Sequence, residues 1–365
     1  MTIIIRWLDY TYPGKESEAP WRPALTDIPV ALPTRCAGAL AKLAPGLALT
    51  GGVAAAAFAL RLIPGVSLLS PMILAVIIGV VIHNFAGAPH SVRPGVDFTL
   101  RRILRLSIVL LGLQITARQA AEIGAPGLAG IAAALVATLG FTILVGRALG
   151  VPRGLALLIG VGASICGASA IVAAKTATAG KDEDAAYAIA CVTLFGTIAM
   201  FAYPLAQGFL HLAPRAYGVW AGASIHEVAQ AVAAAFQGGG EAGEFGAIAK
   251  LTRVAMMAPV VIALGEASAR LGLAGDSERL KPPFPWFLVA FLALAAFNSL
   301  VAVPREIAAA IGVAATFLLS MAMAAMGMHT DISRLRARGL RPLALGLLAS
   351  LFISGFSLLM VRVVL

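Results

Sequence analysis

The stretch Gly160-Val-Gly-Ala-Ser-Ile-Cys-Gly-Ala-Ser169 decides the fold, because it has the setting of a membrane span but not the usual composition. It lies in an uncharged run, 154–174, and a helix of about 20 residues crosses a bilayer. Glycines and small polar side chains weaken a helix, and in lipid a weakened helix persists only beside protein or a water-filled cavity. We therefore predict a discontinuous helix that lines a substrate site. The alternative is a continuous helix whose small residues allow close packing.

Composition supports a membrane protein around this stretch. Of 365 residues, 60% are hydrophobic and only 12% are charged, whereas soluble domains carry about 25% charged residues. The apolar runs are too long for barrel strands, so we predict an all-α polytopic membrane protein. The net charge of +10 is spread through loops, and we predict no nucleic-acid partner. The three cysteines form no CxxC pair, and we predict no metal site and no cofactor.

Eleven spans can be drawn, each close to the length that a bilayer requires. The predicted spans are 43–60, 62–82, 103–117, 126–149, 154–174, 185–210, 216–236, 245–265, 284–303, 307–328 and 342–361. With the N-terminus inside, 18 of the 27 Lys and Arg fall on the inner side and 8 on the outer side, and Arg105 is assigned to neither. Inner loops are the basic ones, so residues 1–42 are predicted to be a retained cytoplasmic tail and 43–365 the transmembrane domain.

Three short matches, in the same order, indicate an internal repeat. They pair Gly79–His83 with Gly222–His226, Arg102–Arg105 with Lys250–Arg253, and Val151–Val161 with Val303–Val313. Spans 2–6, about 62–210, therefore pair with spans 7–11, about 216–361. Five spans per repeat is an odd number, so the two repeats are inverted across the membrane. Inverted repeats with interrupted helices are typical of secondary transporters, and we predict that spans 5 and 10 are both interrupted and cross.

The first predicted ligand group comes from the opening stretch. A break near Gly162 or Gly167 gives a half-helix whose N-terminus presents free N–H groups and the positive end of the helix dipole. Ser164, Cys166 and Ser169 lie beside that end and donate hydrogen bonds without adding charge. This chemistry suits an oxyanion better than a cation, which needs carboxylates or oriented carbonyls.

The second group is Ser224-Ile-His-Glu-Val-Ala-Gln230, a polar segment inside the apolar span 7. Ionisable residues at membrane depth are costly and indicate function. We predict that Ser224, His226 and Gln230 contact the substrate and that His226 and Glu227 couple its transport to protons. The alternative is a structural clasp between helices. The zinc-protease motif HExxH is incomplete, because its second histidine is missing.

The third group is Lys250-Leu-Thr-Arg253, at the start of span 8. These cations either reach the outer interface or face inward as anion ligands. Together the three groups give one set of predicted substrate-binding residues: Gly162, Ser164, Cys166, Gly167, Ser169, Ser224, His226, Gln230 and Arg253.

At these motifs the chain resembles the YeiH-type sulfate exporter family of bacterial inner-membrane proteins. The resemblance rests on Ser164–Ile171, Ser224–Gln230 and Lys250–Arg253, and it covers about 45–365. The family is grouped with the cation:proton antiporter and anion transporter superfamily. The resemblance therefore implies two crossed broken helices in a core domain, a panel domain, elevator or rocking transport, and a homodimer in the inner membrane.

The leading function is secondary transport of a small anion, such as sulfate or an organic sulfonate, and not an enzymatic activity. A cation–proton antiporter is the closest rival, but spans 5 and 10 hold no acidic pair between Gly154 and Met328. A rival of another class is an intramembrane hydrolase, which requires His226 within hydrogen-bond reach of Ser164 or Cys166. A structural or sensor role would leave span 5 continuous.

Overall fold

The computed structural model describes residues 32–66, 69–86, 89–270, 286–301, 304–329 and 340–364. The chain divides into two compact units, Met1–Ala41 and Lys42–Leu365, and the candidate site described below lies in the second. Most of the predicted tail, 1–42, lies outside the described residues.

Every described element is helical, as the composition predicts. The helices are α2 (Leu32–Leu60), α3 (Pro71–Val81), α4 (Arg93–Phe98), α5 (Leu104–Leu111), α6 (Ala117–Glu122), α7 (Gly124–Ala148), α8 (Arg153–Ser164), α9 (Ala168–Ala177), α10 (Asp182–Leu210), α11 (Pro214–Ser224), α12 (Val228–Gln237), α13 (Gly240–Ala255), α14 (Met257–Arg270), α15 (Trp286–Leu300), α16 (Arg305–Met328) and α17 (Leu340–Val364). Short π- and 3-10 turns join some of them: η2 (Ile82–Ala86), η3 (Thr99–Ile103) and η4 (Gly112–Gln114). In the described part of the chain, six helices are long and apolar enough to cross a membrane, and shorter apolar helices accompany them. The all-α polytopic membrane class is therefore confirmed.

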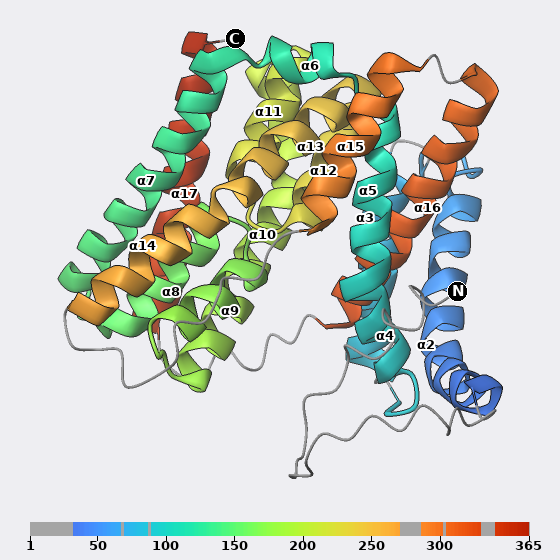
Figure 1. The fold of residues 1–365 in the computed structure, drawn as a ribbon, viewed down its shortest axis with the longest axis horizontal. Coiled ribbons are helices and arrows are strands. Elements are labelled where there is room, and N and C mark those ends of the chain that lie inside the picture. The colour runs from blue at the N-terminus through green and yellow to red at the C-terminus, as the bar shows by residue number, and fades with distance from the viewer. Residues whose placement is uncertain are drawn as a thin grey trace, which may run out of the picture. The chain divides into compact units, whose positions relative to one another are not determined.

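Within Lys42–Leu365 the helices pack in two groups (Figure 1). One group joins α7, α8, α9, α10, α11, α12, α13, α14 and α17, and the other joins α3, α5, α15 and α16. The two groups meet through smaller contacts, among them those of α12 with α3 and α16 and of α13 with α15. The first group contains two interrupted helices, one broken between α8 and α9 and one between α11 and α12, and it therefore holds the candidate site.

Some helix starts follow the repeat spacing that the sequence motifs show. Helix α11 starts at Pro214, 143 residues after α3 at Pro71, and each has 11 residues. Helix α16 starts at Arg305, 152 residues after α8 at Arg153. Proline at the first position explains the α3 and α11 starts, because its fixed φ suits a helix and its missing N–H costs nothing there.

The predicted interruption of span 10 is wrong. Helix α16 runs without a break from Arg305 to Met328, whereas α8 ends after 12 residues at Ser164. After Gly312 the α16 sequence consists largely of Ala, Leu and Met, which are strong helix formers. One glycine costs a helix about 1 kcal/mol, so Gly312 alone does not stop it. Span 5 is interrupted as predicted. The second interrupted span is span 7, which is broken between α11 and α12.

Helices α3 and α16 form the closest contact of the second group. A Cβ added to Gly79 would overlap the Ala324 carbonyl oxygen, and a Cβ added to Gly327 would overlap the Val76 carbonyl oxygen. The two backbones therefore touch directly, as small residues allow in membrane helices.

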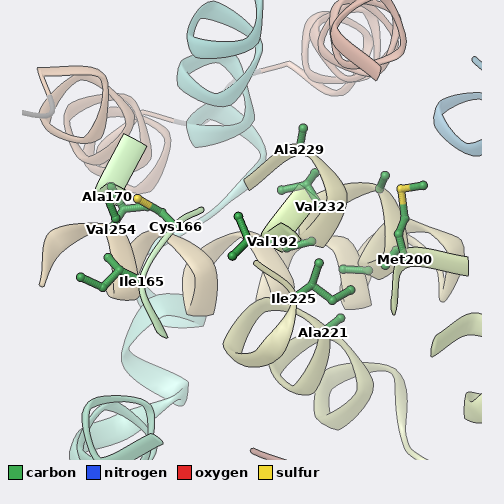
Figure 2. Packing of buried hydrophobic residues seen from close by; sticks show 14 of the residues in the cluster. Ile165, Cys166, Ala170, Val192, Met200, Ala221, Ile225, Ala229, Val232 and Val254 are labelled. Carbon is green, nitrogen blue, oxygen red and sulfur yellow. The ribbon is translucent and has the colours of Figure 1, made fainter. Parts of the chain in front are cut away.

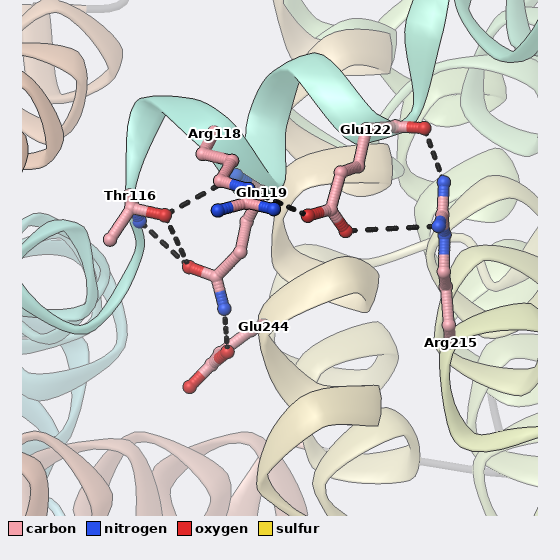
Figure 3. A network of polar contacts seen from close by, with 6 residues as sticks. All are labelled: Thr116, Arg118, Gln119, Glu122, Arg215 and Glu244. Carbon is pink, nitrogen blue, oxygen red and sulfur yellow. Dashed lines mark hydrogen bonds and ion pairs between the residues drawn. The ribbon is translucent and has the colours of Figure 1, made fainter.

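A surface network attaches the short helix α6 to the first group (Figure 3). Thr116 and Gln119 form a capping box at the start of α6, and Gln119 Nε2 donates to Glu244 Oε2 of α13 at 2.5 Å. Arg215 of α11 donates to the Glu122 carbonyl oxygen and lies 3.7 Å from the Glu122 carboxylate. Such partly exposed ion pairs contribute about 1 kcal/mol or less each.

Candidate functional site

The first break separates α8 from α9. Helix α8 ends at Ser164 and α9 starts at Ala168. Between them, Gly167 has φ +72° and ψ −131°, a region that essentially only glycine occupies. Its N–H donates to the Gly162 carbonyl oxygen at 3.0 Å, which closes the end of α8. The glycine-rich stretch thus interrupts the helix where the sequence predicts.

The second break separates α11 from α12, over Ile225–Glu227. Ser224, the last residue of α11, donates its hydroxyl to the Trp220 carbonyl oxygen at 2.5 Å. Such back-bonding weakens a helix locally. Glu227 is extended, with φ −84° and ψ 148°, so the chain leaves the helix for three residues before α12 begins.

Lys250 of α13 ties the two breaks together from inside the protein. Its ammonium donates to the carbonyl oxygens of Ile165 at 3.1 Å, Ile225 at 2.7 Å and His226. The last carbonyl oxygens of a half-helix have no hydrogen-bond donor within that helix. An ammonium group offers three donors. One cation therefore satisfies backbone oxygens from both interrupted helices.

Arg253, one turn further along α13, binds the same two helix ends. Its Nε donates to Ser164 O at 3.0 Å and one terminal nitrogen to Ala163 O at 2.6 Å. The other terminal nitrogen donates to Ala223 O at 2.9 Å and Ile225 O at 3.0 Å. Lys250 and Arg253 are both 0% exposed, so neither reaches the interface as one reading of the sequence allowed.

Glu227 crosses from the second break to the first. Its Oε1 accepts a hydrogen bond of 2.7 Å from the backbone N–H of Ala168, the first residue of α9. A Cβ on Gly167 would overlap this carboxyl group, so the carboxyl packs directly on the glycine backbone. A carboxylate at a helix N-terminus is favourable, because it meets the positive end of the dipole.

His226 and Gln230 face other helices of the first group. His226 Nε2 lies 2.6 Å from Ser350 Oγ of α17, and that hydroxyl also donates to the Gly346 carbonyl oxygen. The Nδ1 of His226 is buried and has no protein partner in the described structure.

Gln230 binds α10 through its amide nitrogen, which donates to Thr193 O at 3.0 Å and to Thr197 Oγ1 at 2.8 Å. Its Oε1 is buried without a protein partner in the same structure. A Cβ on Gly196 would overlap that oxygen, so α10 and α12 approach closely there.

Apolar side chains enclose most of this meeting point. Figure 2 shows Ile165, Cys166 and Ile225 among buried residues of the core. Residues 161–167 and 217–226 are buried throughout, whereas Ser169 is exposed and Glu227 is partly exposed. The exposed part of this region is therefore the N-terminus of α9, next to Glu227.

The predicted ligand residues gather in this region, with different roles in the described contacts. Gly162 and Gly167 close the first break, Ser164 donates to Val161 O at 3.4 Å, and Arg253 binds backbone oxygens. Cys166 Sγ lies 3.9 Å from Met257 Sδ. The structure thus pairs His226 with Ser350, and it does not pair His226 with Ser164 or Cys166 as a hydrolase requires.

Several residues of the region escaped the sequence reasoning. Ser350, Thr193 and Thr197 are isolated hydroxyl residues in apolar helices, a pattern that is common in packing. Lys250 could be recognised from the sequence, because it and Arg253 are two cations three residues apart at the start of span 8. The second break lies in span 7, and the sequence signal for it was the polar segment Ser224–Gln230. That local signal was a better guide than the position of span 10 in the repeat.

Comparison with known proteins assigns the family. Residues 45–346 match the family model described as Conserved hypothetical protein 698. The chain is 39% identical over 290 residues to a UPF0324 membrane protein of Bordetella bronchiseptica, which covers 76% of this chain and 88% of that protein. It is 38% identical over 334 residues to a UPF0324 membrane protein of Pseudomonas aeruginosa, covering 88% of this chain and 94% of that protein. No solved structure matches the chain.

The chain is therefore a multi-pass membrane protein of a family of uncharacterised function. It belongs to the Conserved hypothetical protein 698 family, whose matching relatives are UPF0324 membrane proteins. This is the YeiH-type group, which confirms the resemblance that the three motifs carry.

Proposed function

We propose that this protein is a secondary transporter of a small oxyanion, sulfate-like in chemistry, that binds where the two interrupted helices meet. One observation carries the proposal: Lys250 and Arg253 are buried between the breaks, and Glu227 is the one carboxylate in the described contacts there. One positive charge is left without a partner of opposite sign. An uncompensated charge at membrane depth is costly, and an incoming anion removes that cost.

The surroundings suit an oxyanion in two further ways. Helices α9 and α12 both begin at the breaks. The N-terminus of a helix attracts anions through its free N–H groups and the helix dipole. Ser169 offers an exposed hydroxyl beside α9. A cation would meet the two resident positive charges instead.

The proposal extends to coupling and setting. His226 and Glu227 are the proton-coupling residues, since they are titratable groups in the second break. The protein acts as an exporter in the bacterial inner membrane, with its N-terminus in the cytoplasm as the positive-inside rule favours. It works as a homodimer and catalyses no chemical reaction.

Flux in proteoliposomes tests the function. The purified protein is reconstituted, and uptake of sulfate, sulfite, methanesulfonate, bicarbonate and Na⁺ is compared with that of protein-free liposomes. We expect at least one anion to enter faster with protein than without, and faster still when a pH gradient is imposed. Protein-dependent Na⁺ flux with no anion flux would contradict an anion transporter and favour a cation–proton antiporter.

Removing the Ser164 hydroxyl should weaken anion binding. In the described contacts the Ser164 hydroxyl makes one long bond, to its own helix, so it can turn to a ligand at little cost. The Ser164→Ala variant should lose about 1–2 kcal/mol of binding free energy, the scale of a hydrogen bond to a charged group. Titration calorimetry with the transported anion measures the loss, and Ser299→Ala on α15 is the control. Equal affinity in Ser164→Ala and the control would remove Ser164 from the site.

A further inference from the structure

We propose that the Glu227 carboxylate occupies the seat of the transported anion, so that the anion binds only when Glu227 takes up a proton and leaves. This inference rests on the proposed function and deepens it. It assigns one subsite, the N-terminus of α9, to two occupants that exclude each other. The coupling of anion to proton then follows from competition for the same backbone donor.

The contact of Glu227 with α9 is built to hold a carboxyl group. Oε1 accepts from Ala168 N–H at 2.7 Å, and both carboxyl oxygens lie over Gly167, where no side chain intervenes. Gly167 keeps its unusual conformation at the same point. The protein thus presents a donor and a space shaped to an oxyanion group, and its own side chain fills them.

Independent observations indicate that a second occupant can arrive. Most of the meeting point is buried, but Ser169 on the first turn of α9 is exposed and Glu227 is partly exposed. The subsite therefore lies at the accessible part of the region. His226, next to Glu227, is 2% exposed and keeps a buried Nδ1 without a protein partner in the described residues.

The seat also narrows the class of substrate. The resident group is a carboxylate, with two oxygens on one small planar centre. A ligand that replaces it presents an oxyanion face of similar size, as sulfate, sulfonates and carboxylates do. A halide has no such pair of oxygens, so the subsite favours oxyanions over halides.

Charge balance gives the direction of the coupling. When Glu227 is ionised, it occupies α9 and offsets one of the two buried cations. When Glu227 is protonated, it is a weaker acceptor for the N–H of α9 and gives neither cation a counter-charge, so an anion is attracted to α9 in its place. Anion binding is therefore strong below the pKa of Glu227 and weakens above it. One proton and one anion enter the site together, and both leave together.

Other titratable groups surround Glu227. They are His226 in the same segment, Cys166 in the first break, and Lys250 and Arg253 on α13. Lys250 and Arg253 donate to backbone carbonyls, and His226 Nε2 is held by Ser350. Glu227 is the group whose titration frees an N–H of α9.

Calorimetric titration of the purified full-length protein with sodium sulfate tests the competition. Sulfate stays a dianion between about pH 5 and about pH 8, so any pH dependence belongs to the protein. For the wild type, the apparent Kd should rise about tenfold per pH unit above the pKa of Glu227, as linkage to one proton requires. For Glu227→Gln, which has no carboxyl proton to lose, we expect a Kd independent of pH and close to the low-pH wild-type value.

Glu244→Gln is the matched control, because Glu244 is a carboxylate of α13 that binds Gln119, away from the breaks. It should keep the wild-type pH profile. A second measurement needs no variant: in weakly buffered solution at high pH, wild-type protein should take up about one proton per sulfate bound. Absence of proton uptake, or a wild-type pH slope retained in Glu227→Gln, would overturn the competition.

The two proposals fail in different ways. If wild-type protein binds or transports an oxyanion and the apparent Kd does not change with pH, the proposed transport function is retained and the proposed role of Glu227 is contradicted. If neither sulfate nor methanesulfonate binds at any pH, and no anion moves in the flux assay, the transport function itself fails. Chloride offered in place of sulfate tests the substrate class, and binding as tight as that of sulfate would contradict an oxyanion seat.

Discussion

Replacing Arg253 by Met is expected to lower the free energy of unfolding by about 3–5 kcal/mol, because a buried carbonyl oxygen that loses its donor costs about 1–3 kcal/mol. The Arg253 side chain satisfies carbonyl oxygens of Ala163, Ser164, Ala223 and Ile225. Methionine fills similar space but donates no hydrogen bond, so four oxygens at the ends of α8 and α11 lose a donor. Thermal unfolding of the detergent-solubilised protein measures the loss.

Arg215→Met provides the control for this variant. Arg215 is also an arginine of the first helix group, but it lies at the surface, where it pairs with Glu122 and covers the Phe245 ring. Its removal should cost about 1 kcal/mol or less. Equal stability losses in the two variants would mean that the hydrogen bonds of Arg253 to the two breaks do not stabilise the fold.

The Gly167→Ala variant should lose stability through two separate effects. The positive φ of Gly167 disfavours any side chain, at about 1–3 kcal/mol. The added Cβ also collides with the Glu227 carboxyl, and such overpacking costs about 1–3 kcal/mol more. Displacement of the carboxyl should in addition abolish the bond to Ala168, and with it the pH dependence of sulfate binding.

Gly65→Ala separates the two effects. Gly65 also has a positive φ, +90°, but nothing lies within 4 Å of the site of its missing Cβ. This control should show the conformational cost alone and keep the wild-type pH profile. If Gly65→Ala and Gly167→Ala lost the same stability, the proposed contact between Gly167 and Glu227 would carry no energy.

Sequence reasoning predicted the class of fold and the first interrupted helix for a clear physical reason. Hydrophobic length and low charge decide whether a segment can cross a membrane, and both are local properties. The break in span 5 is local as well, because Gly162 and Gly167 weaken the helix wherever it lies. The polar segment of span 7 was singled out by the same kind of local signal, and the second break lies within it.

The partner of the first break and the role of the cations could not be predicted in the same way. The repeat assigned the partner break to span 10, but the residues of α16 after Gly312 favour a continuous helix. Arg253 looked like an anion ligand, yet its donors meet backbone carbonyls that become available only when two helices end together. Such a contact depends on tertiary structure, and no spacing along the chain contains it.

The backbone contact between α3 and α16 has a mechanical consequence. Where Gly79 and Gly327 bring two backbones together, no side chain lies between them whose rotamer could change. The pair is therefore stiff, and it forms a fixed frame against which the rest of the bundle can be displaced. The contacts of α12 with α3 and α16 are much sparser than this one, so a sliding motion would meet its least resistance along that boundary, beside the second break.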